Sequence, residues 1–306
     1  MATFSQGSRS RLAYGVQADY STAATTFYEL PHQSNSLDLT KETLESSTLR
    51  FDRQQTISRH GNRQVGGDIA VEFCDDTYDD LLAAAMLNDW VSDEITIGTD
   101  PKWLTFEEYA SDIDQARLYT GCTVNTLGVS ISNNAMVTST FGILGADRTT
   151  SATEKSVTDA AGNAPFDSYS GTVQIGDTGG SLSGSTILTS FELNIDNGMA
   201  HAFAIGSATA PQITAGMANV TFTATFYYED DSIISRFEDE TETALSISVG
   251  LAGSSDVYTF LLPRTKFNEA PVPVDGPDVR LITVSGVALK DDVEETLLKI
   301  TRPTTV

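Results

Sequence analysis

The sequence predicts a mainly β protein made of two tandem β-sandwich or barrel units, each with one short α-helix at its flank. The main reason is a pattern that occurs twice, about 150 residues apart. In each copy, alternating apolar and polar residues lead into an acidic step and then a short apolar stretch, which is typical of a strand followed by a helix. The second reason is that such alternating segments recur along the chain between turn residues.

The two copies match segment by segment. The alternating segment, the acidic step and the apolar stretch occupy 65–73, 75–80 and 81–83 in the first copy, and 216–226, 229–232 and 233–237 in the second. The ends of the halves also resemble each other, at 138–144 and 283–289. We therefore expect the halves to fold alike, with a helix at 77–88 matching one at 231–238. Repeated units commonly serve assembly.

The chain begins with a segment of different composition. Residues 1–36 are rich in Ser, Thr, Ala and Gln, and we interpret them as an N-terminal arm. The first unit follows at 37–146. Its alternating segments predict strands at 37–41, 45–57, 65–74, 94–98, 102–108, 121–132 and 136–144. Thr77 is expected to cap the helix, and Asn133-Asn134 to form the last turn.

A second change of composition separates the halves. Residues 147–186 are dense in Ser, Thr, Gly, Ala and Asp, which predicts an insertion or connector, with a local hairpin near 171–176. The second unit is expected at 187–306. Its predicted strands are 188–196, 199–205, 217–229, 243–250, 256–262, 279–289 and 295–301. Three prolines, at 271, 273 and 277, predict a loop or a sheet edge before residue 279.

Net charge and cysteine content exclude some classes of protein. The net charge is −24, from 42 acidic and 18 basic residues. This excludes an ordinary phosphate-gripping DNA binder, but not a surface that must avoid holding DNA. Cys74 and Cys122 are too few for a secreted disulfide scaffold, and neither a signal peptide nor an apolar run of membrane-spanning length is present. We expect a soluble protein, made in the cytoplasm with reduced thiols.

No motif has the form of a catalytic, cofactor or metal site. The acidic step could be proposed as a calcium site, but it lacks the ligand alternation and turn glycine of a calcium loop, which favours a helix start with solvated carboxylates. The residues of this step are Asp75, Asp76, Asp79 and Asp80. The other candidate ligands are scattered along the chain: Cys74, Cys122, His32, His60 and His201. No GxSxG, HExxH or Walker-type sequence occurs, so an enzyme is not expected.

The more specific signal lies in the two faces of the strands, because side chains alternate across a strand. One set is apolar and should face the core: Ile69, Val71, Phe73, Phe222 and Phe226. The other set is acidic or neutral, without Lys or Arg: Asp68, Glu72, Glu192, Asn194, Thr221, Thr223 and Thr225. This polar set fits an ordinary solvated outer face, or alternatively the wall of a channel.

Several short motifs, taken in order, resemble the major tail tube protein of long flexible-tailed (siphovirus-type) bacteriophages, in a tandem-duplicated form. The motifs are Arg11–Gly15, Val65–Ile69 leading to Tyr78–Leu82, Tyr119–Asn125, Phe191–Asn197 and Leu262–Phe267. The resemblance covers nearly the whole chain except 147–186. It implies β-sandwich or barrel units whose edge strands join subunits into closed rings, which stack into a tube for the genome.

The resemblance also implies partners and a site. Members with two units form trimeric rings of pseudo-sixfold symmetry, and members with one unit form hexamers; the duplication favours the trimer. The expected partners are further copies of the chain, the tape measure protein and DNA transiently in the lumen, the tail terminator and baseplate proteins, but no membrane. The polar set listed above would face the lumen. The resemblance implies that the protein is located in the virion tail, after assembly in the host cytoplasm.

Simple geometry agrees with such a ring. Four strands per unit give about 24 strands, which at about 4.8 Å spacing and about 40° tilt form a circumference of roughly 150 Å. The lumen would be roughly 35–40 Å across, wide enough for a DNA duplex about 20 Å wide. An acidic or neutral wall would let the duplex slide, whereas basic residues would hold its phosphates.

Two alternatives stay open, and one segment has an expected role in assembly. The chain could be a baseplate hub, a tail terminator or a capsid decoration protein, or an extracellular carbohydrate-binding β-sandwich, although only Trp90 and Trp103 could form aromatic platforms.

The arm should carry Arg9 and Arg11 as contacts between rings, because the body they meet is acidic. Residues 1–30 and 147–186 should become ordered only in the tube.

Overall fold

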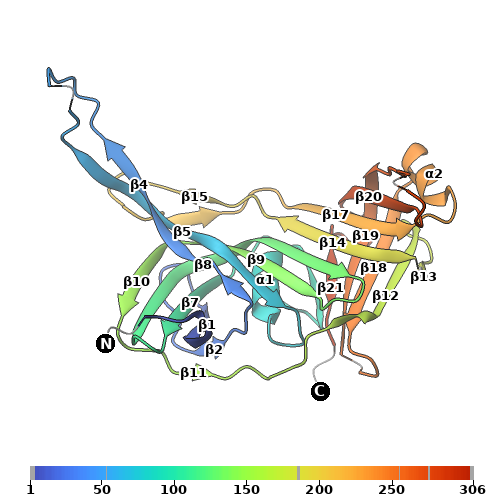
Figure 1. Cartoon of the computed structure of the whole chain (residues 1–306), viewed down its shortest axis with the longest axis horizontal. Helices are drawn as coiled ribbons and strands as arrows, with labels where there is room; N and C mark the ends of the chain where they lie inside the picture. Colours follow the sequence, from blue (N-terminus) through green and yellow to red (C-terminus); the bar gives the residue numbers. More distant parts are fainter. Residues whose placement is uncertain (1–3, 53, 185–186, 255, 275, 304–306) are drawn as a thin grey trace.

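The computed structural model describes residues 4–52, 54–184, 187–254, 256–274 and 276–303, and it confirms the mainly β class (Figure 1). Two helices lie beside the strands, α1 (Asp79–Met86) and α2 (Ser232–Glu238), near the predicted ranges. A single 3-10 turn, Gly7–Arg9, precedes the first strand. Among the residues described, no helix is long and apolar enough to cross a membrane.

The strands fall into two series along the chain. The first series is β1 (Ser10–Gln17), β2 (Phe27–Glu29), β3 (Ser34–Asn35), β4 (Asp38–Glu45), β5 (Ser58–Glu72), β6 (Glu94–Thr96), β7 (Trp103–Ala110), β8 (Gln115–Ser132), β9 (Thr138–Gly145), β10 (Asp147–Ser151) and β11 (Val157–Thr158). The second is β12 (Asp167–Asp177), β13 (Ser183–Gly184), β14 (Leu188–Asp196), β15 (Ala200–Ala202), β16 (Gln212–Thr214), β17 (Asn219–Tyr227), β18 (Thr243–Gly250), β19 (Val257–Glu269), β20 (Leu281–Ala288) and β21 (Lys299–Thr301).

One antiparallel sheet runs through both halves of the molecule. Its strand order is β4–β5–β9–β8–β14–β17–β20–β19, and we call it the main sheet (Figure 1). The long strands β8 and β19 leave it part-way and enter second layers. The first part of β8 pairs with β7 and β10, and the first part of β19 pairs with β18. Each half therefore has four strands in the main sheet.

The two halves repeat one scheme of strand pairing. The first half pairs β1 with β7, β7 with β8, β8 with β9, β9 with β5 and β5 with β4. The second half pairs β12, β18, β19, β20, β17 and β14 in the same succession. Each half also places its helix directly after the corresponding strand, β5 or β17. The strand order in the two halves is thus the same.

The irregularities of the sheets repeat as well. The β7–β8 pairing shifts register between Leu104 and Phe106, and the β18–β19 pairing shifts between Thr243 and Leu245. The second pair of shifts lies in β8 between 124 and 126, and in β19 between 267 and 269. Both shifts fall at corresponding positions once the strands are matched. Such β-bulges re-aim a strand and are local features of a particular fold, so their recurrence strengthens the match.

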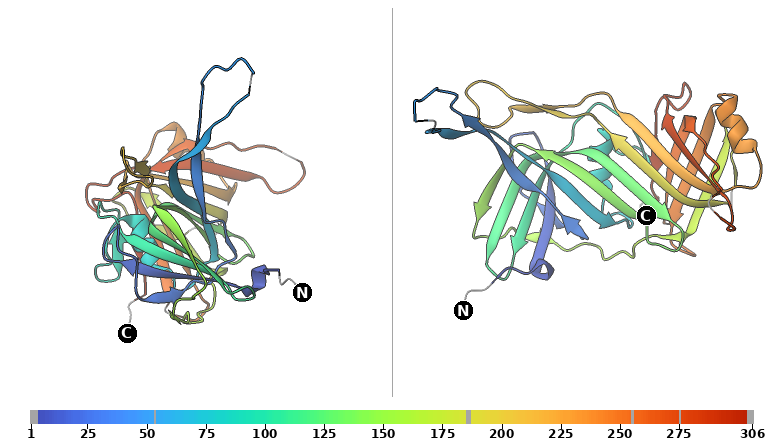
Figure 2. Two further views of the ribbon diagram at one scale, coloured as in Figure 1. Left: turned by 90° about the vertical axis from the view of Figure 1, so that its left-hand side faces the viewer. Right: turned by 45° about the horizontal axis from the view of Figure 1, so that its top comes forward.

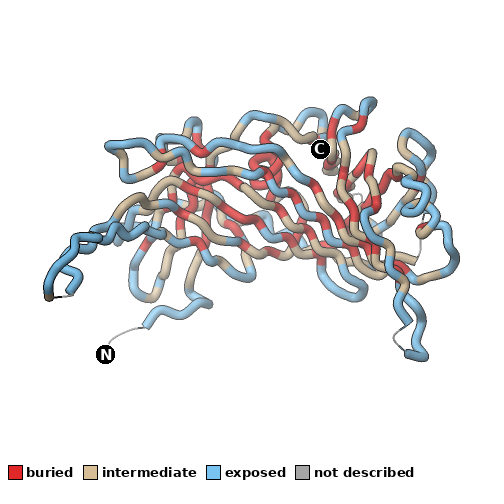
Figure 3. Tube along the Cα trace, turned by 90° about the horizontal axis from the view of Figure 1, so that it is seen from above, coloured by how far each residue is buried: buried red, intermediate tan, exposed pale blue. Residues whose placement is uncertain are grey.

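The buried side chains follow the predicted alternation. Ile69, Val71 and Phe73 are buried on β5 and its end, and Phe222 and Phe226 are buried on β17. Helix α1 is buried along nearly its whole length, whereas α2 buries only Ile233. Figure 3 shows the buried residues gathered along the sheet and the exposed ones at the loops and the projecting β4–β5 hairpin. The core is continuous through both halves.

Much of the segment predicted to be an N-terminal arm, residues 1–36, is instead part of the folded first half. Strand β1 pairs with β7 along its full length, from Ser10 opposite Ala110 to Gln17 opposite Trp103. Leu12 is buried in the core. The segment folds because its few large apolar residues alternate correctly on a strand, a signal that its Ser- and Gln-rich composition hid. Residues 10–17 and 27–29 thus form strands of the first half rather than a separate arm.

The predicted insertion is also divided between the two halves. Strand β10 pairs with β8 in the first half, and β12 pairs with β18 in the second. The hairpin expected near 171–176 is instead part of β12, which pairs with β13. Two smaller predictions fail too. Residues 46–52 and 54–57 are not strand, and the Thr77 hydroxyl donates to the carbonyl of Asp75 rather than capping α1. The Asn133-Asn134 turn is confirmed between β8 and β9.

Candidate assembly interface

The outer face of the main sheet is a mainly polar surface. One row crosses seven strands in strict register: Glu72, Thr138, Ser130, Glu192, Thr223, Ser285 and Glu269. A second row contains Ala70, Thr140, Gly128, Asn194, Thr221, Val287 and Lys266. Asp68 lies in the next row, opposite Gly142, and Thr225 lies opposite Thr283 in the row on the other side. We call this surface the polar face.

The seven residues predicted to share one polar surface all lie on the polar face. Asp68, Glu192 and Asn194 are exposed, and the other four are half-buried by their neighbours: Glu72, Thr221, Thr223 and Thr225. The one cation in the two long rows is Lys266, and its ammonium is held by Glu240 at 2.5 Å. The face therefore offers hydroxyl groups and carboxylates, with its single cation neutralised at one end.

A joint between β8 and β14 connects the halves. The two strands pair from Ser190 opposite Ser132 to Asp196 opposite Thr126. Immediately beyond it, the side chain of Asn197, which is 1% exposed, donates to the carbonyl of Ala85 in α1 at 2.8 Å. The joint is thus an ordinary antiparallel pairing between a strand of one repeat and a strand of the next.

A hairpin of the second half crosses the first half. Strands β15 and β16 pair with each other and lie beside β5 (Figures 1 and 2). The hydroxyl of Tyr20 donates to the carbonyl of Ala210 at 2.7 Å, and the amide of Arg63 donates to the carbonyl of Ala208 at 2.8 Å. His201 Nε2 lies 2.9 Å from the carbonyl oxygen of Gly145. The corresponding hairpin of the first half, β4–β5, projects away from the body (Figure 2).

The C-terminal segment closes a second connection. Strand β21 pairs with β6 of the first half and with β19 of the second. Beside it, the Asp79 carboxylate accepts from Tyr258 at 2.6 Å and from Arg302 at 2.5 Å. Burial raises the pKa of Asp79, although both hydrogen bonds oppose that rise. Arg302 also pairs with Asp93 at 3.2 Å, and its guanidinium lies 4.7 Å from the Trp90 ring centre.

This arrangement corrects the expectation of solvated carboxylates at the helix start. Asp79 is 8% exposed and Asp80 accepts from the Tyr14 hydroxyl at 3.1 Å, so both are structural. In the described part of the chain, no group of three or more His, Cys, Asp or Glu side chains could hold a metal ion. Cys74 and Cys122 are buried free thiols, and burial raises the pKa of Cys122.

The two predicted contact arginines differ in their surroundings. Arg11 pairs with Glu107 at 3.1 Å and lies 3.6 Å from Glu154, so its charge is already used within the subunit. Glu107 is 1% exposed, which makes Arg11 its necessary counter-ion. Arg9 is exposed at the end of the 3-10 turn that precedes β1. Of the pair, only Arg11 forms ion pairs among the described residues.

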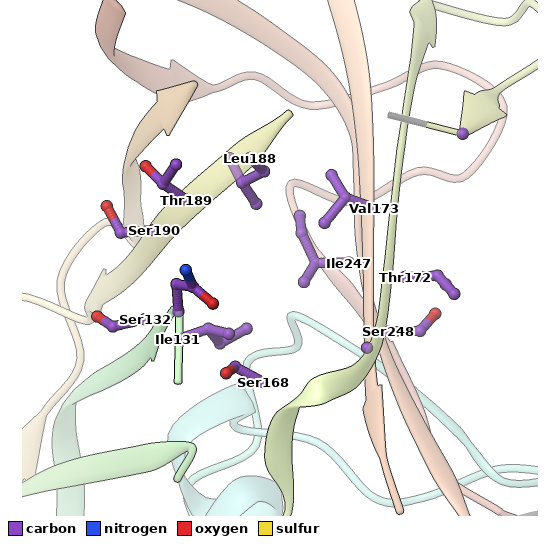
Figure 4. Close-up of a pocket in the computed structure, with 13 residues that line it drawn as sticks. Ile131, Ser132, Ser168, Thr172, Val173, Leu188, Thr189, Ser190, Ile247 and Ser248 are labelled. Carbon is purple, nitrogen blue, oxygen red and sulfur yellow. The ribbon is translucent and has the colours of Figure 1, made fainter. Parts of the chain in front are cut away.

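A pocket of about 410 Å³ lies where the two halves meet (Figure 4). It is lined by Ile131, Val173, Leu188 and Ile247 together with several serine and threonine residues. None of the described lining residues carries a carboxylate, an imidazole or a thiol. The pocket thus lacks an acid–base or nucleophile–base pair, and its position beside the β8–β14 joint makes it a feature of that joint.

The two ends of the main sheet are unlike and both are open. At the first end, residues 34–40 pair with β5 on one side only. At the second end, β19 stops at Glu269 and the described residues after it, 270–274 and 276–280, are not in a strand. Within the described ranges neither end pairs with another strand of this chain on its outer side. For the second end, the prolines before residue 279 predict a loop or a sheet edge, whereas the first end and the joint depend on pairings distant in the chain and leave no such local signal.

Comparison with known proteins gives one family. A family model described as phage tail tube protein matches residues 7–288, nearly the whole chain. No curated protein matches the chain. The matched range includes both halves, the joint between them and the connecting segment that the motif resemblance had left out.

Proposed function

The chain belongs to the phage tail tube protein family, and from that premise we propose that its copies form stacked rings whose inner wall is the polar face. The family makes it a structural component of the virion tail. The proposed tube is a channel for passage of DNA to the host, and assembly takes place in the host cytoplasm. The partners proposed are other copies of the chain, the tape measure protein and DNA in the lumen, and the terminator and baseplate proteins at the ends.

One observation carries the proposal: a single sheet that repeats the same four strands twice and is open at both ends. An open edge invites pairing, and closure into a ring removes it. Two repeats per chain favour a trimeric ring of pseudo-sixfold symmetry over a hexamer. Three chains would supply about 24 main-sheet strands and a lumen roughly 35–40 Å across. We also propose that the repeats are residues 10–151 and 167–303, since β1 corresponds to β12.

The chemistry of the polar face supports its assignment to the lumen. Its rows are mostly Ser, Thr, Asn, Asp and Glu, with Ala70, Val287 and two glycines among them, and the cation Lys266 is neutralised by Glu240. A wall of this kind repels phosphates weakly and offers them no cationic partner, so a duplex would slide along it. The apolar face of the same sheet is covered by the core and cannot take that role.

Electron microscopy of the purified protein tests the proposal. We expect rings and tubes with a central hole, and class averages with threefold symmetry and a sixfold outline. Short closed rings that never extend would favour a terminator or hub instead. A monomer that neither forms rings nor joins tubes of an intact phage assembly extract would contradict the proposal.

A further inference from the structure

We propose that residues 36–40 of one chain pair antiparallel with residues 269–273 of a second copy, in the register of the internal β8–β14 joint. Leu37 then lies opposite Val272, Leu39 opposite Ala270, and Thr40 opposite Glu269. The inference rests on the proposed function for the identity of the partner, the next chain in a ring. It adds which strands meet and in which register.

The register follows from the repeat. Thr126 in β8 and Glu269 in β19 are each the first paired residue after the same bulge. Asn194 in β14 and Asp38 in β4 lie opposite Thr221 and Gly66, which hold corresponding places in β17 and β5. Two residues further on, Asp196 corresponds to Thr40. Because Asp196 lies opposite Thr126 within the chain, Thr40 should lie opposite Glu269 between chains.

The side chains at both edges already have the orientation that the pairing needs. At the internal joint, Leu193 and Leu127 face the core. At the first edge, Leu37 is buried in the core and Leu39 packs against it. Past the end of β19, Ala270 and Val272 also pack against the core, whereas residues 271 and 273 are exposed. The chain after Glu269 thus keeps the alternation of a strand although nothing pairs with it there.

The spacing of two prolines fits a strand that pairs on one side only. At the internal joint the amide of Asn133 donates to the carbonyl of Thr189, so alternate β8 amides, which include that of Val129, point at β14. The corresponding amides at the second edge are those of Ala270 and Val272. Pro271 and Pro273 occupy the positions between them, whose amides would point back at β20. They stop β19 from pairing further with β20 and remove no donor from the open side.

Backbone groups on both open edges are held by side chains of the same subunit. The amide of Leu37 donates to Asn35 Oδ1 at 3.0 Å, and that of Leu39 donates to Asp38 Oδ1 at 2.7 Å. The carbonyl of Val272 accepts from the Arg280 guanidinium at 3.1 Å. Leu37 N–H and Val272 C=O are donor and acceptor of one proposed bond between chains. Such side-chain caps blunt an edge until the correct strand replaces them.

A disulfide trap tests the register in assembled protein. Thr40 and Glu269 would form a non-hydrogen-bonded pair with Cα atoms about 4.5 Å apart, within reach of a disulfide. The double variant Thr40→Cys/Glu269→Cys should give covalent dimers and closed rings on a denaturing gel after mild oxidation of tubes. The matched control Asp38→Cys/Glu269→Cys places its thiols on a diagonal of about 7–8 Å, too far to bridge. The native cysteines are buried.

Three outcomes separate the two ideas. Cross-linking of the Thr40 pair well above the Asp38 control, within tubes seen by microscopy, supports the register. Normal tubes without that cross-link, or with the control cross-linked instead, overturn the register and leave the proposed function intact. Failure of the unmodified protein to form rings or tubes overturns both.

A second pair of variants covers the case in which the cysteine variants do not assemble. Ala270→Pro removes an amide that the proposed pairing uses, whereas Pro271→Ala adds one on the side facing β20. Circular dichroism and thermal melting should show both folded. We expect Ala270→Pro to lose at least tenfold in tube yield and Pro271→Ala to assemble normally. Normal tubes from Ala270→Pro would overturn the proposed strand.

Discussion

The two halves share a strand order, yet their hairpins are used differently. The hairpin of the second half lies across the first half and is held there by Tyr20, Arg63 and Gly145. The corresponding hairpin of the first half, between β4 and β5, projects free, and Leu49 and Phe51 near its tip are 98% and 100% exposed. An apolar side chain held in solvent on an extended ribbon suits contact with another molecule. What one half contacts within the chain, the other should contact between chains.

Shortening each hairpin is the strongest test of that comparison. Replacing residues 44–59 by Asn-Gly keeps Thr43 opposite His60 and makes a tight turn. We expect a folded subunit with an unchanged melting temperature and no tubes by microscopy. The matched change replaces residues 203–211 by Asn-Gly between Ala202 and Gln212. It should lower the melting temperature, because it deletes contacts within the chain. If both changes shifted the melting temperature equally, the two hairpins would not differ in their contacts within the chain.

Among changes to a single side chain, we expect the largest loss of unfolding free energy at the C-terminal connection. Arg302→Ala leaves the Asp79 carboxylate buried without its cation, which costs about 3–5 kcal/mol of unfolding free energy. Asp79→Asn in the same chain should restore part of this loss, because an amide does not need a counter-ion. Urea unfolding of the two variants measures the difference. A loss below about 1 kcal/mol for Arg302→Ala would show that the halves do not depend on this contact.

The same variant has a pH dependence with a definite sign. Burial raises the pKa of Asp79 in the folded chain, so folding favours its protonated form. Stability from that protonation is present at low pH and is lost as the pH rises through the folded-state pKa. The loss of unfolding free energy caused by Arg302→Ala should therefore be smaller at about pH 5 than at about pH 7. Unfolding free energies at both pH values check this, and a growing deficit would contradict it.

The helices provide a third contrast between the halves. Leu82 in α1 is fully buried, and Ile233 in α2 is 9% exposed on a helix that is otherwise at the surface. Leu82→Ala should cost about 2–5 kcal/mol, since it leaves a cavity in the core. Ile233→Ala should cost roughly half as much, because solvent and neighbours can fill the gap. Denaturant midpoints compare the two; similar costs would mean that α2 is packed as tightly as α1.

The smallest effect on stability, and a specific effect on function, is expected at the polar face. Asp68→Lys/Glu72→Lys should change unfolding free energy by about 0.5 kcal/mol or less, because the sites are exposed or half-buried. Genome ejection should slow, since each new cation can hold a phosphate. The neutral control Asp68→Asn/Glu72→Gln should eject at nearly the normal rate. Ejection at that rate from intact tubes of the lysine variant would argue against a luminal position.

Much of the fold could be predicted because local alternation decides it. The strands and helices whose apolar residues alternate cleanly were located within a few residues, as at β14, β17 and α2. The sequence does not predict strand β1, because only Leu12 and Tyr14 point to a core in a segment otherwise rich in small polar residues. The sequence predicts a strand where residues 46–52 and 54–57 form none, because Leu49, Phe51 and Ile57 alternate like strand residues while they face solvent.

The candidate interface could be predicted only in part, because some of its features depend on pairings between distant segments of the chain. The polar side chains could be assigned to one face from period-two alternation, and the structure places all seven there. The pairing of β8 with β14, and the ion pair of Arg302 with Asp79, join residues far apart in the chain. One local signal is present at the second edge, and from it the sequence predicts only a loop or a sheet edge. Prolines at 271 and 273 alternate with residues that pack inward, the pattern of a strand with one usable edge.

The β8–β14 joint has a consequence for how a ring begins. In a ring of three chains, half of the joints between repeats are already made when each chain folds, so they do not depend on protein concentration. Three linked chains need two encounters between molecules before the ring closes, whereas six unlinked repeats need five, and each avoided encounter saves the translational and rotational entropy of bringing two bodies together. Nucleation should thus be faster and complete at lower concentration than for unlinked repeats. The linkage also frees the two kinds of joint to diverge, since one is made by folding and the other by recognition.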